Sequence, residues 1–294
     1  MPGREPEVDP VLQRRRLRER LRQLREARGL KQWQVAEALE WSNSKVIRIE
    51  TGTVRVSITD FRALLQHYEV TDPAVVTELT ELARAARIQP WWDEYKKDAP
   101  RGFVLSLGYE SNALRIRTFE PALVPGLLQT EEYALTVLEL LSPPEKVTSR
   151  ATLRLKRQER LFRDNGPDLH FIIDENAITR IVGNPSIMRR QLEHLQEMLD
   201  HPQVTLRFVP FGAGLYQHFR TSYVIFEFEN PQAETVLYLE PPEEHDSIVR
   251  EGQSQDWDSG LSPQHYLSNF FGLEEIAKKE DAPGIIEAAI ARLP

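Results

Sequence analysis

The sequence predicts an all-α N-terminal domain followed by an α+β domain with a small sheet. Whether this sheet mixes parallel and antiparallel strands is left open by the sequence. Apolar residues recur at helical spacing from 17 to 87, whereas short runs rich in Val, Ile, Phe and Tyr lie between 168 and 240. The 294 residues, 40% apolar and 28% charged, suffice for two globular domains. The stretch PWWDEYKKDAPRGF mixes Pro, paired Trp and charge, so we expect domains at 1–88 and 92–294.

The first expected helix lies in an Arg-rich segment. Leu17, Leu21 and Leu24 recur at positions i, i+4 and i+7, which is the pattern of an amphipathic helix. Gly29 follows and favours a helix end there.

Two shorter helices are predicted in KQWQVAEALEWSNSKVIRIETG, residues 31–52. The first has an apolar stripe of Val35, Ala36 and Leu39, and the second begins after Ser42, a natural N-cap. Helices of about two turns do not persist alone, so they must pack against each other and their neighbours. This is the pattern of a helix-turn-helix, whose second helix enters the DNA major groove.

Two further helices complete the expected N-terminal domain. Ser57 and Asp60 form a variant of the capping box for one of them. Residues 73–87 predict the other, which makes five helices in about ninety residues, a compact all-helical domain.

This region resembles a known family. The tokens LREARGL, VAEAL, WSNSKVIRIETG and RALLQHY look like an Xre-type helix-turn-helix of the phage-repressor class, in the form common in Streptomyces-type regulators. The resemblance implies that Asn43, Ser44 and Arg48 point from a recognition helix at 43–50 toward base edges. It also places Gln32 at the start of the preceding helix and Lys45 beside the phosphates.

Side-chain chemistry supports this assignment unevenly. Asn pairs bidentately with adenine and Arg with guanine, but Arg48 has an alternative role as a phosphate contact that only sets the register. Ile47 either touches a thymine methyl or packs on a neighbouring helix. Where the family commonly has Gly in the turn, this chain has Glu40, and a non-Gly residue in a left-handed conformation costs on the order of 1 kcal/mol.

The charge is distributed unequally along the chain. Residues 1–68 hold 14 Lys and Arg against 9 Asp and Glu, a net of +5, and the remainder carries −13. A basic reading domain suits phosphate binding whatever the total charge, although Arg-rich helices are also ordinary solvated faces.

The second domain is expected to alternate helices with strands. Strands are predicted at DLHFIID, VTLRFVP, TSYVIFEF and TVLYLE. Helices are predicted after Thr130, over 145–163, after Asn184 with Pro185 in the first turn, and at 263–279 and 284–292.

The sequence gives little support for catalysis, a metal or a cofactor. Cysteine is absent, the seven histidines are scattered, and neither a phosphate-loop nor a nucleophile-elbow motif occurs. The cluster Glu243, Glu244, His245 and Asp246 is better interpreted as a solvated acidic loop than as a cation site. Asp174 and Glu175, at a strand end, are either an acid–base pair or a helix cap, and capping is the more ordinary role. We therefore expect no enzyme.

The second domain also resembles a family. FEPALVPGLLQTEEYA, IIDENAI, RRQLEHL, VTLRFVPF and VLYLE look like the C-terminal domain of unassigned function that follows the Xre-type module in many actinomycete regulators. The resemblance implies a regulator whose second domain senses a ligand or a protein. Some relatives are antitoxin-like and pair with a small protein from a neighbouring gene. VPGLLQTEEYA itself is either core packing with a helix start or a partner or effector surface.

The sequence thus predicts a sequence-specific DNA-binding regulator, a repressor, that binds double-stranded DNA as a homodimer. The alternative is an antitoxin-like protein that binds a small partner and regulates its own operon. A signal peptide and an apolar run near the roughly 20 residues of a membrane helix are both missing, so we expect a cytoplasmic protein with no membrane contact.

Overall fold

The computed structural model describes residues 10–228, 235–240, 248–251 and 262–294. The chain divides into two compact units, Met1–Trp91 and Trp92–Pro294. The domain limits predicted from the sequence, 1–88 and 92–294, stay a prediction about which segments fold independently.

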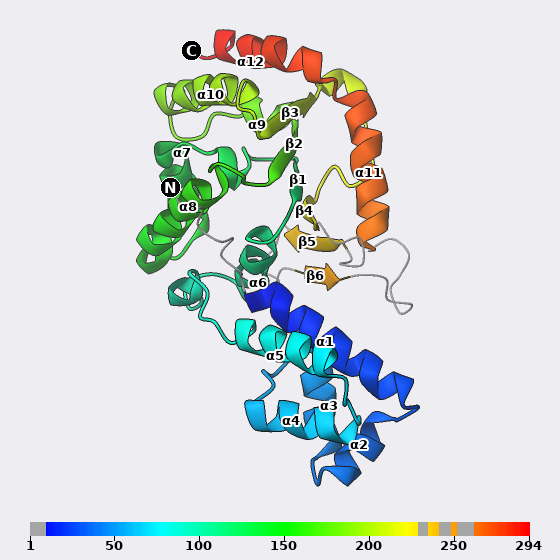
Figure 1. The fold of residues 1–294 in the computed structure, drawn as a ribbon. Helices are drawn as coiled ribbons and strands as arrows, with labels where there is room; N and C mark the ends of the chain where they lie inside the picture. The colour runs from blue at the N-terminus through cyan, green and yellow to red at the C-terminus, as the bar shows by residue number, and fades with distance from the viewer. Residues whose placement is uncertain (1–9, 229–234, 241–247, 252–261) are drawn as a thin grey trace. The chain divides into compact units, whose positions relative to one another are not determined.

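The first unit is helical, as the spacing predicts (Figure 1). Its helices are α1 (Pro10–Ala27), α2 (Gln32–Ala38), α3 (Asn43–Glu50), α4 (Ile58–His67) and α5 (Pro73–Ala85). The predicted stripes of all five meet in one core, which includes Leu17, Leu21, Val35, Ala36, Val46, Ile49, Phe61, Leu64 and Leu79. Two predicted caps are confirmed, because Ser42 accepts a hydrogen bond from the Lys45 amide and Ser57 accepts one from the Asp60 amide.

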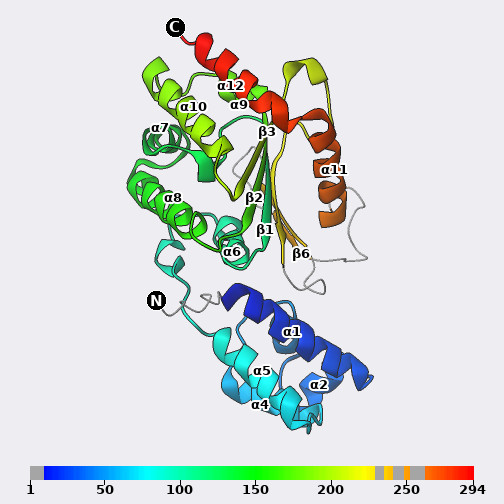
Figure 2. The same cartoon turned by 45° about the horizontal axis from the view of Figure 1, so that its top comes forward.

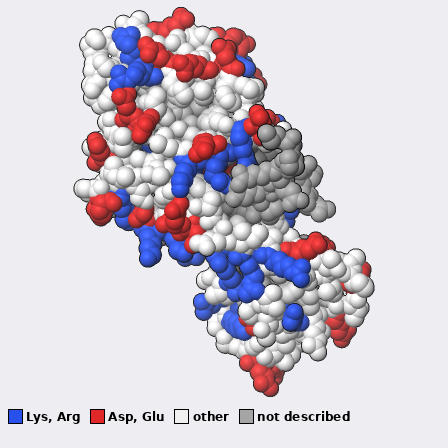
Figure 3. Space-filling model, turned by 60° about the vertical axis from the view of Figure 1, so that its left-hand side comes forward, with Lys and Arg blue, Asp and Glu red and all other residues white. Residues whose placement is uncertain are grey.

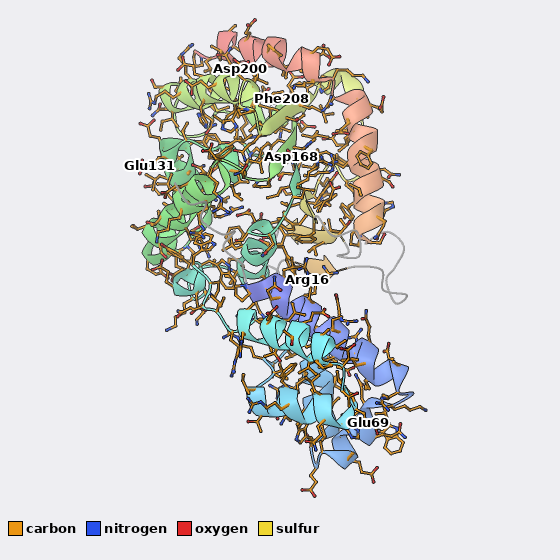
Figure 4. All side chains as sticks on the ribbon, viewed as in Figure 1. Arg16, Glu69, Glu131, Asp168, Asp200 and Phe208 are labelled. Atoms are coloured by element: carbon orange, nitrogen blue, oxygen red, sulfur yellow. The ribbon has the colours of Figure 1, made fainter. Side chains whose placement is uncertain are left out.

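Four of these helices are followed by a residue in the left-handed conformation, and Gly52 (φ +75°) is the one after α3. Gly29 (φ +66°) ends α1, Glu40 (φ +54°) ends α2 and Glu69 (φ +49°; labelled in Figure 4) ends α4. After α2, the Trp41 amide bonds to the Ala36 carbonyl at 2.8 Å and the Glu40 amide to the Glu37 carbonyl at 3.2 Å, which is a Schellman motif. The strained non-Gly turn expected at Glu40 is therefore present.

The second unit mixes helices and strands. Its strands are β1 (Arg115–Glu120), β2 (Asp168–Asp174), β3 (Val204–Val209), β4 (Ser222–Glu227), β5 (Val236–Glu240) and β6 (Ile248–Glu251). Its α-helices are α6 (Arg101–Glu110), α7 (Glu131–Leu141), α8 (Val147–Leu161), α9 (Glu175–Thr179), α10 (Pro185–Leu199), α11 (Pro263–Ile276) and α12 (Ala282–Ala291). Short 3-10 helices are η1 (Asp93–Tyr95), η2 (Gly126–Leu128), η3 (Pro144–Lys146), η4 (Phe211–Ala213) and η6 (Lys279–Asp281).

The six strands form one mixed sheet in the order β3-β2-β1-β4-β5-β6. β1, β2 and β3 are parallel, whereas β4, β5 and β6 pair antiparallel with their neighbours. The predicted fold class, an all-α region followed by an α+β domain, is confirmed, and the open question of pairing is answered by a mixed sheet. The four predicted strands correspond to β2–β5, while β1 and β6 were not expected.

Helices cover both faces of this sheet. α7, α8 and α10 lie on one side and α11 lies on the other (Figure 2). Alternate strand residues point to opposite faces, so one set, including Phe119, Ile172, Tyr223, Leu237 and Leu239, packs against Phe270 and Leu273 of α11. The predicted caps Thr130 and Asn184 start α7 and α10, with Pro185 in the first turn of α10.

Within the described ranges, no helix is long and apolar enough to cross a membrane. No group of three or more His, Asp or Glu side chains there is arranged to hold a metal ion. The acidic cluster at 243–246 lies outside the described residues.

Candidate nucleic-acid interface

The outward face of α3 carries the polar residues expected to read DNA. Val46 and Ile49 are 1% and 5% exposed and hold α3 in the core, whereas Asn43, Ser44 and Arg48 are exposed. With 3.6 residues per turn, the three exposed residues lie on one side of the helix, opposite the buried pair. The structure therefore brings these three predicted residues together on one accessible face.

Asn43 and Arg48 keep their side chains free for an external partner. Within the part of the chain that the structure describes, neither side chain makes a hydrogen bond or ion pair. The Arg48 carbonyl accepts a hydrogen bond from the Val54 amide at 3.2 Å, which ties the loop after α3 to the helix. Ser44 differs, because its hydroxyl lies 3.1 Å from that of Ser42, the N-cap.

Lys45 points to the flank of this face and has internal partners. Its Nζ lies 2.6 Å from Asp60 Oδ1 and 3.8 Å from the centre of the Trp41 ring. Burial raises the pKa of Asp60, but hydrogen bonds from Lys45 and Ser57 outweigh burial and lower that pKa below its ordinary value. The Lys45 charge is therefore partly neutralised before any phosphate approaches.

Gln32 also has an internal partner. It is the first residue of α2, where the resemblance places it, and its Nε2 donates to Glu50 Oε2 at 2.8 Å. Its side-chain amide is thus directed at the end of α3. Of the five predicted DNA contacts, Gln32, Ser44 and Lys45 have hydrogen-bond partners within the unit.

A buried ion pair that the sequence reasoning missed fixes α3 against α1. Arg25 donates to Glu50 through Nε at 2.6 Å and through Nη2 at 3.0 Å, and to the Leu30 carbonyl through Nη1 at 2.7 Å. Arg25 is 8% and Glu50 2% exposed. The hydrogen bond to Glu50 raises the pKa of Arg25 more than burial lowers it. Helical spacing offered a signal, because Arg25 lies four residues after the buried Leu21, and Glu50 lies four residues after the buried Val46.

Two large apolar side chains, one on α2 and one on α3, are exposed. Ile47, on α3, is 38% exposed, so part of its side chain is open to solvent. Trp33, the second residue of α2, is 54% exposed. Trp33 lies outside the apolar stripe of α2, and this position was the only sequence signal that its side chain would be exposed.

Basic side chains gather on the first unit. In the view of Figure 3, Lys and Arg side chains gather on one part of its surface, with a few carboxylates next to them. This arrangement agrees with the net charge of +5 counted over residues 1–68 and gives phosphates a favourable electrostatic environment.

The carboxylates at the end of β2 serve structural roles. Asp174 Oδ1 accepts the Asn176 amide at 2.8 Å and caps α9, and the Tyr216 hydroxyl donates to Oδ2. Glu175 accepts the Phe211 amide at 2.9 Å. The capping interpretation is therefore confirmed for Asp174.

The VPGLLQTEEYA segment is mainly core. Val124, Leu128 and Tyr133 are at most 1% exposed, and Gln129 is 4% exposed. Core packing and the helix start at Glu131 thus account for its apolar residues. The buried Gln129 side chain donates a hydrogen bond to the Val124 carbonyl at 2.7 Å.

Comparison with known families divides the chain in the same way. Residues 16–79, from α1 to α5, match a family described as a helix-turn-helix domain. Residues 105–259, from α6 to beyond β6, match a family described as a domain of unknown function, DUF5753. No curated protein and no solved structure gives a significant match.

Proposed function

The chain belongs to the DUF5753 family and carries a helix-turn-helix domain ahead of that region, and we propose on this basis that it is a sequence-specific DNA-binding repressor of the Xre type. The observation that carries the proposal is the outward face of α3, where the side chains of Asn43 and Arg48 are exposed and make no hydrogen bond or ion pair within the described chain. A cytoplasmic location belongs to the proposal, because such a regulator must reach chromosomal DNA.

In this account α3 enters the major groove and α2 lies across its edge. Asn43 and Arg48 read base edges, with adenine and guanine as their bidentate partners. Ser44 adds a less selective contact. Lys45 and Gln32 set the position of the helix on the phosphates. The Lys45 ammonium group also pairs with Asp60, which weakens its attraction to a phosphate.

The reading surface of one unit is small, so we propose that two copies bind a two-fold inverted repeat. The half-sites of such a repeat lie one helical turn, roughly 34 Å, apart. Equilibrium ultracentrifugation with and without the DNA tests this: a dimer on DNA is expected, and a monomer in both samples would contradict it. Control through residues 92–294, by a ligand or a protein, is part of the same proposal.

A second candidate function rests on the net charge of −13 carried after residue 68. Opposite charge accelerates the encounter with a small basic protein. In this second proposal, the chain is an antitoxin-like protein that sequesters such a partner and regulates its own operon. Co-purification distinguishes the two candidates, because a stoichiometric small protein supports sequestration. In neither account is the protein an enzyme.

The experiment that tests the proposed function is selection of genomic fragments by the purified protein at near-physiological salt, followed by footprinting. A discrete inverted repeat near a promoter is expected. Diffuse binding to all fragments, abolished by a modest increase in salt, would contradict sequence-specific reading, because non-specific binding rests on phosphate contacts alone.

A further inference from the structure

Three polar residues form a row across one end of the sheet. Phe119, Tyr223 and Leu239 pair in register on β1, β4 and β5 and face α11. The next row consists of Glu120, Ser222 and Glu240, in which Ser222 pairs with Glu240 and its hydroxyl donates to Glu120 Oε2 at 2.6 Å. Since successive residues alternate between faces, this row points to the opposite side, where α7 and α8 lie (Figure 2).

α8 directs a guanidinium toward the same region. Arg154 Nη1 donates to the side-chain carbonyl of Gln129, and Gln129 Nε2 donates to the Val124 carbonyl at 2.7 Å. The Tyr133 hydroxyl accepts the Val124 amide at 3.3 Å, and the described residues include no acceptor for its own proton. The VPGLLQTEEYA segment thus contributes two polar side chains beside Arg154 and the carboxylate row.

Glu120 and Glu240 influence Arg154 electrostatically but form no ion pair with it. Among the described residues, no carboxylate oxygen lies within 4.0 Å of a nitrogen of Arg154. Desolvation raises the pKa of Glu120 to about 8 and also raises that of Glu240, and in both cases the Arg154 charge acts in the opposite direction. Desolvation lowers the pKa of Arg154 to about 10.

Glu240 is exposed and Glu120 and Arg154 are half-buried, so these three charged groups stay in reach of solvent. The neighbouring pair differs, since Arg157 binds Glu110 through two hydrogen bonds of 3.0 and 2.6 Å. Arg154 and the two glutamates instead stay apart while each keeps hydrogen-bonding capacity. Both signs of charge are therefore available to one small molecule.

We propose that this cluster binds a small zwitterion of the amino-acid type, with Arg154 receiving its carboxylate and Glu120 and Glu240 its ammonium group. A planar guanidinium suits a carboxylate through two parallel hydrogen bonds, and carboxylate oxygens accept from an ammonium group. Ser222 and Tyr133 add a hydroxyl at each side. The cluster lies at the carboxyl end of β1, where the parallel half of the sheet meets β4, and ligands of open α/β sheets bind at carboxyl ends of strands.

The test uses the full chain without DNA, so its result is independent of whether the protein binds an operator. Thermal shift with each of the common L-amino acids, followed by titration calorimetry of those that stabilise, measures the binding. Acetate and ethylammonium, which carry one end each, are the ligand controls. We expect at least one amino acid to stabilise the protein and both controls to fail. No stabilisation by any amino acid, or equal stabilisation by a control, overturns the proposal.

Variants place the binding in this cluster. Arg154→Gln and Glu240→Gln are each expected to weaken the affinity about tenfold or more, the usual loss for a charged hydrogen bond. Glu159→Gln, an exposed residue of α8, is the matched control and should bind as the wild type. If Arg154→Gln fails to fold, Arg154→Lys keeps the charge but loses the second hydrogen bond. Unchanged affinity in the folded variants would contradict the assignment.

Discussion

Arg25 and Glu50 form a buried bidentate ion pair that joins the last turn of α1 to the last residue of α3, with distances of 2.6 and 3.0 Å. Glu50 also accepts from Gln32, the first residue of α2. One carboxylate therefore connects three helices of the helix-turn-helix. Because α3 is short, its orientation depends on such contacts rather than on its own stability.

Removing Glu50 should strongly destabilise the first unit. In Glu50→Ala the Arg25 charge stays buried without its partner, which costs about 3–5 kcal/mol of unfolding free energy. Chemical denaturation of the full chain, followed by far-UV circular dichroism, measures the loss. Glu26→Ala is the control, because Glu26 is an exposed partner of the same arginine at 3.2 Å and should cost less than about 1 kcal/mol. Equal losses in the two variants would contradict this account.

Freeing Lys45 should strengthen non-specific DNA binding. Asp60→Asn removes the carboxylate that lies 2.6 Å from the Lys45 ammonium, so one more full positive charge becomes available to phosphates. The slope of log affinity against log salt should steepen by about one counterion. Fluorescence anisotropy with a random-sequence duplex measures this slope. Glu37→Gln, which removes an exposed charge from α2, controls for the change in net charge, and the same steepening in that variant would contradict a specific release of Lys45.

Glycine at position 40 should stabilise the protein. Glu40 adopts φ +54°, a conformation that glycine reaches without steric cost, so Glu40→Gly should add about 0.5–1 kcal/mol. Thermal or urea unfolding measures the change. Glu37→Gly, three residues earlier within α2, should instead lower the free energy of unfolding by about 1 kcal/mol, because glycine destabilises the interior of a right-handed helix. Destabilisation by both changes would show that the turn does not need a left-handed residue.

Stability should fall as pH rises through the range in which Glu120 ionises. Its folded pKa of about 8 exceeds the ordinary 4.5, so the folded state holds the proton more tightly and its contribution is lost between pH 4.5 and 8. His170, whose folded pKa is lowered to about 4 by burial, acts in the opposite direction, because its unfolded side chain still binds part of a proton near pH 6.5 and loses it as the pH rises. Urea unfolding at pH 6.5 and 8 should differ by up to about 1.4 kcal/mol per pH unit.

Glu120→Gln provides the control for this pH dependence. The amide keeps a hydrogen-bonding group beside Ser222 but cannot ionise, so the variant should lose less stability between pH 6.5 and 8 than the wild type. An identical pH profile in both proteins would assign the dependence to other groups.

The first unit was predictable because its helices follow simple local rules. Apolar spacing located the inner faces of the helices, and Ser42 and Ser57 marked two starts correctly. What the sequence could not provide was the partner of each polar side chain. Lys45 carries a charge suited to phosphate, but its distance from Asp60 depends on how α3 and α4 pack, which local spacing does not encode.

The second unit was harder because its first strand lacks the usual pattern. β1 reads RIRTFE, in which Arg117 is 5% exposed yet pairs with Glu227 at 2.6 Å, a residue more than a hundred positions away. A strand with a charged residue that is buried only through a distant partner is assigned to a loop by patterns that use neighbouring residues alone. The row of Glu120, Ser222 and Glu240 was hidden for the same reason, because it exists only through strand register.

The most direct test of the central claim, that the outward face of α3 reads an operator, is the affinity of wild type and Arg48→Ala for the footprinted site and for a scrambled duplex at one salt concentration. The variant should lose about 1–3 kcal/mol of binding free energy on the operator and little on the scrambled sequence, because a base contact is specific. An equal loss on both duplexes would make Arg48 a phosphate contact and contradict base reading by this residue.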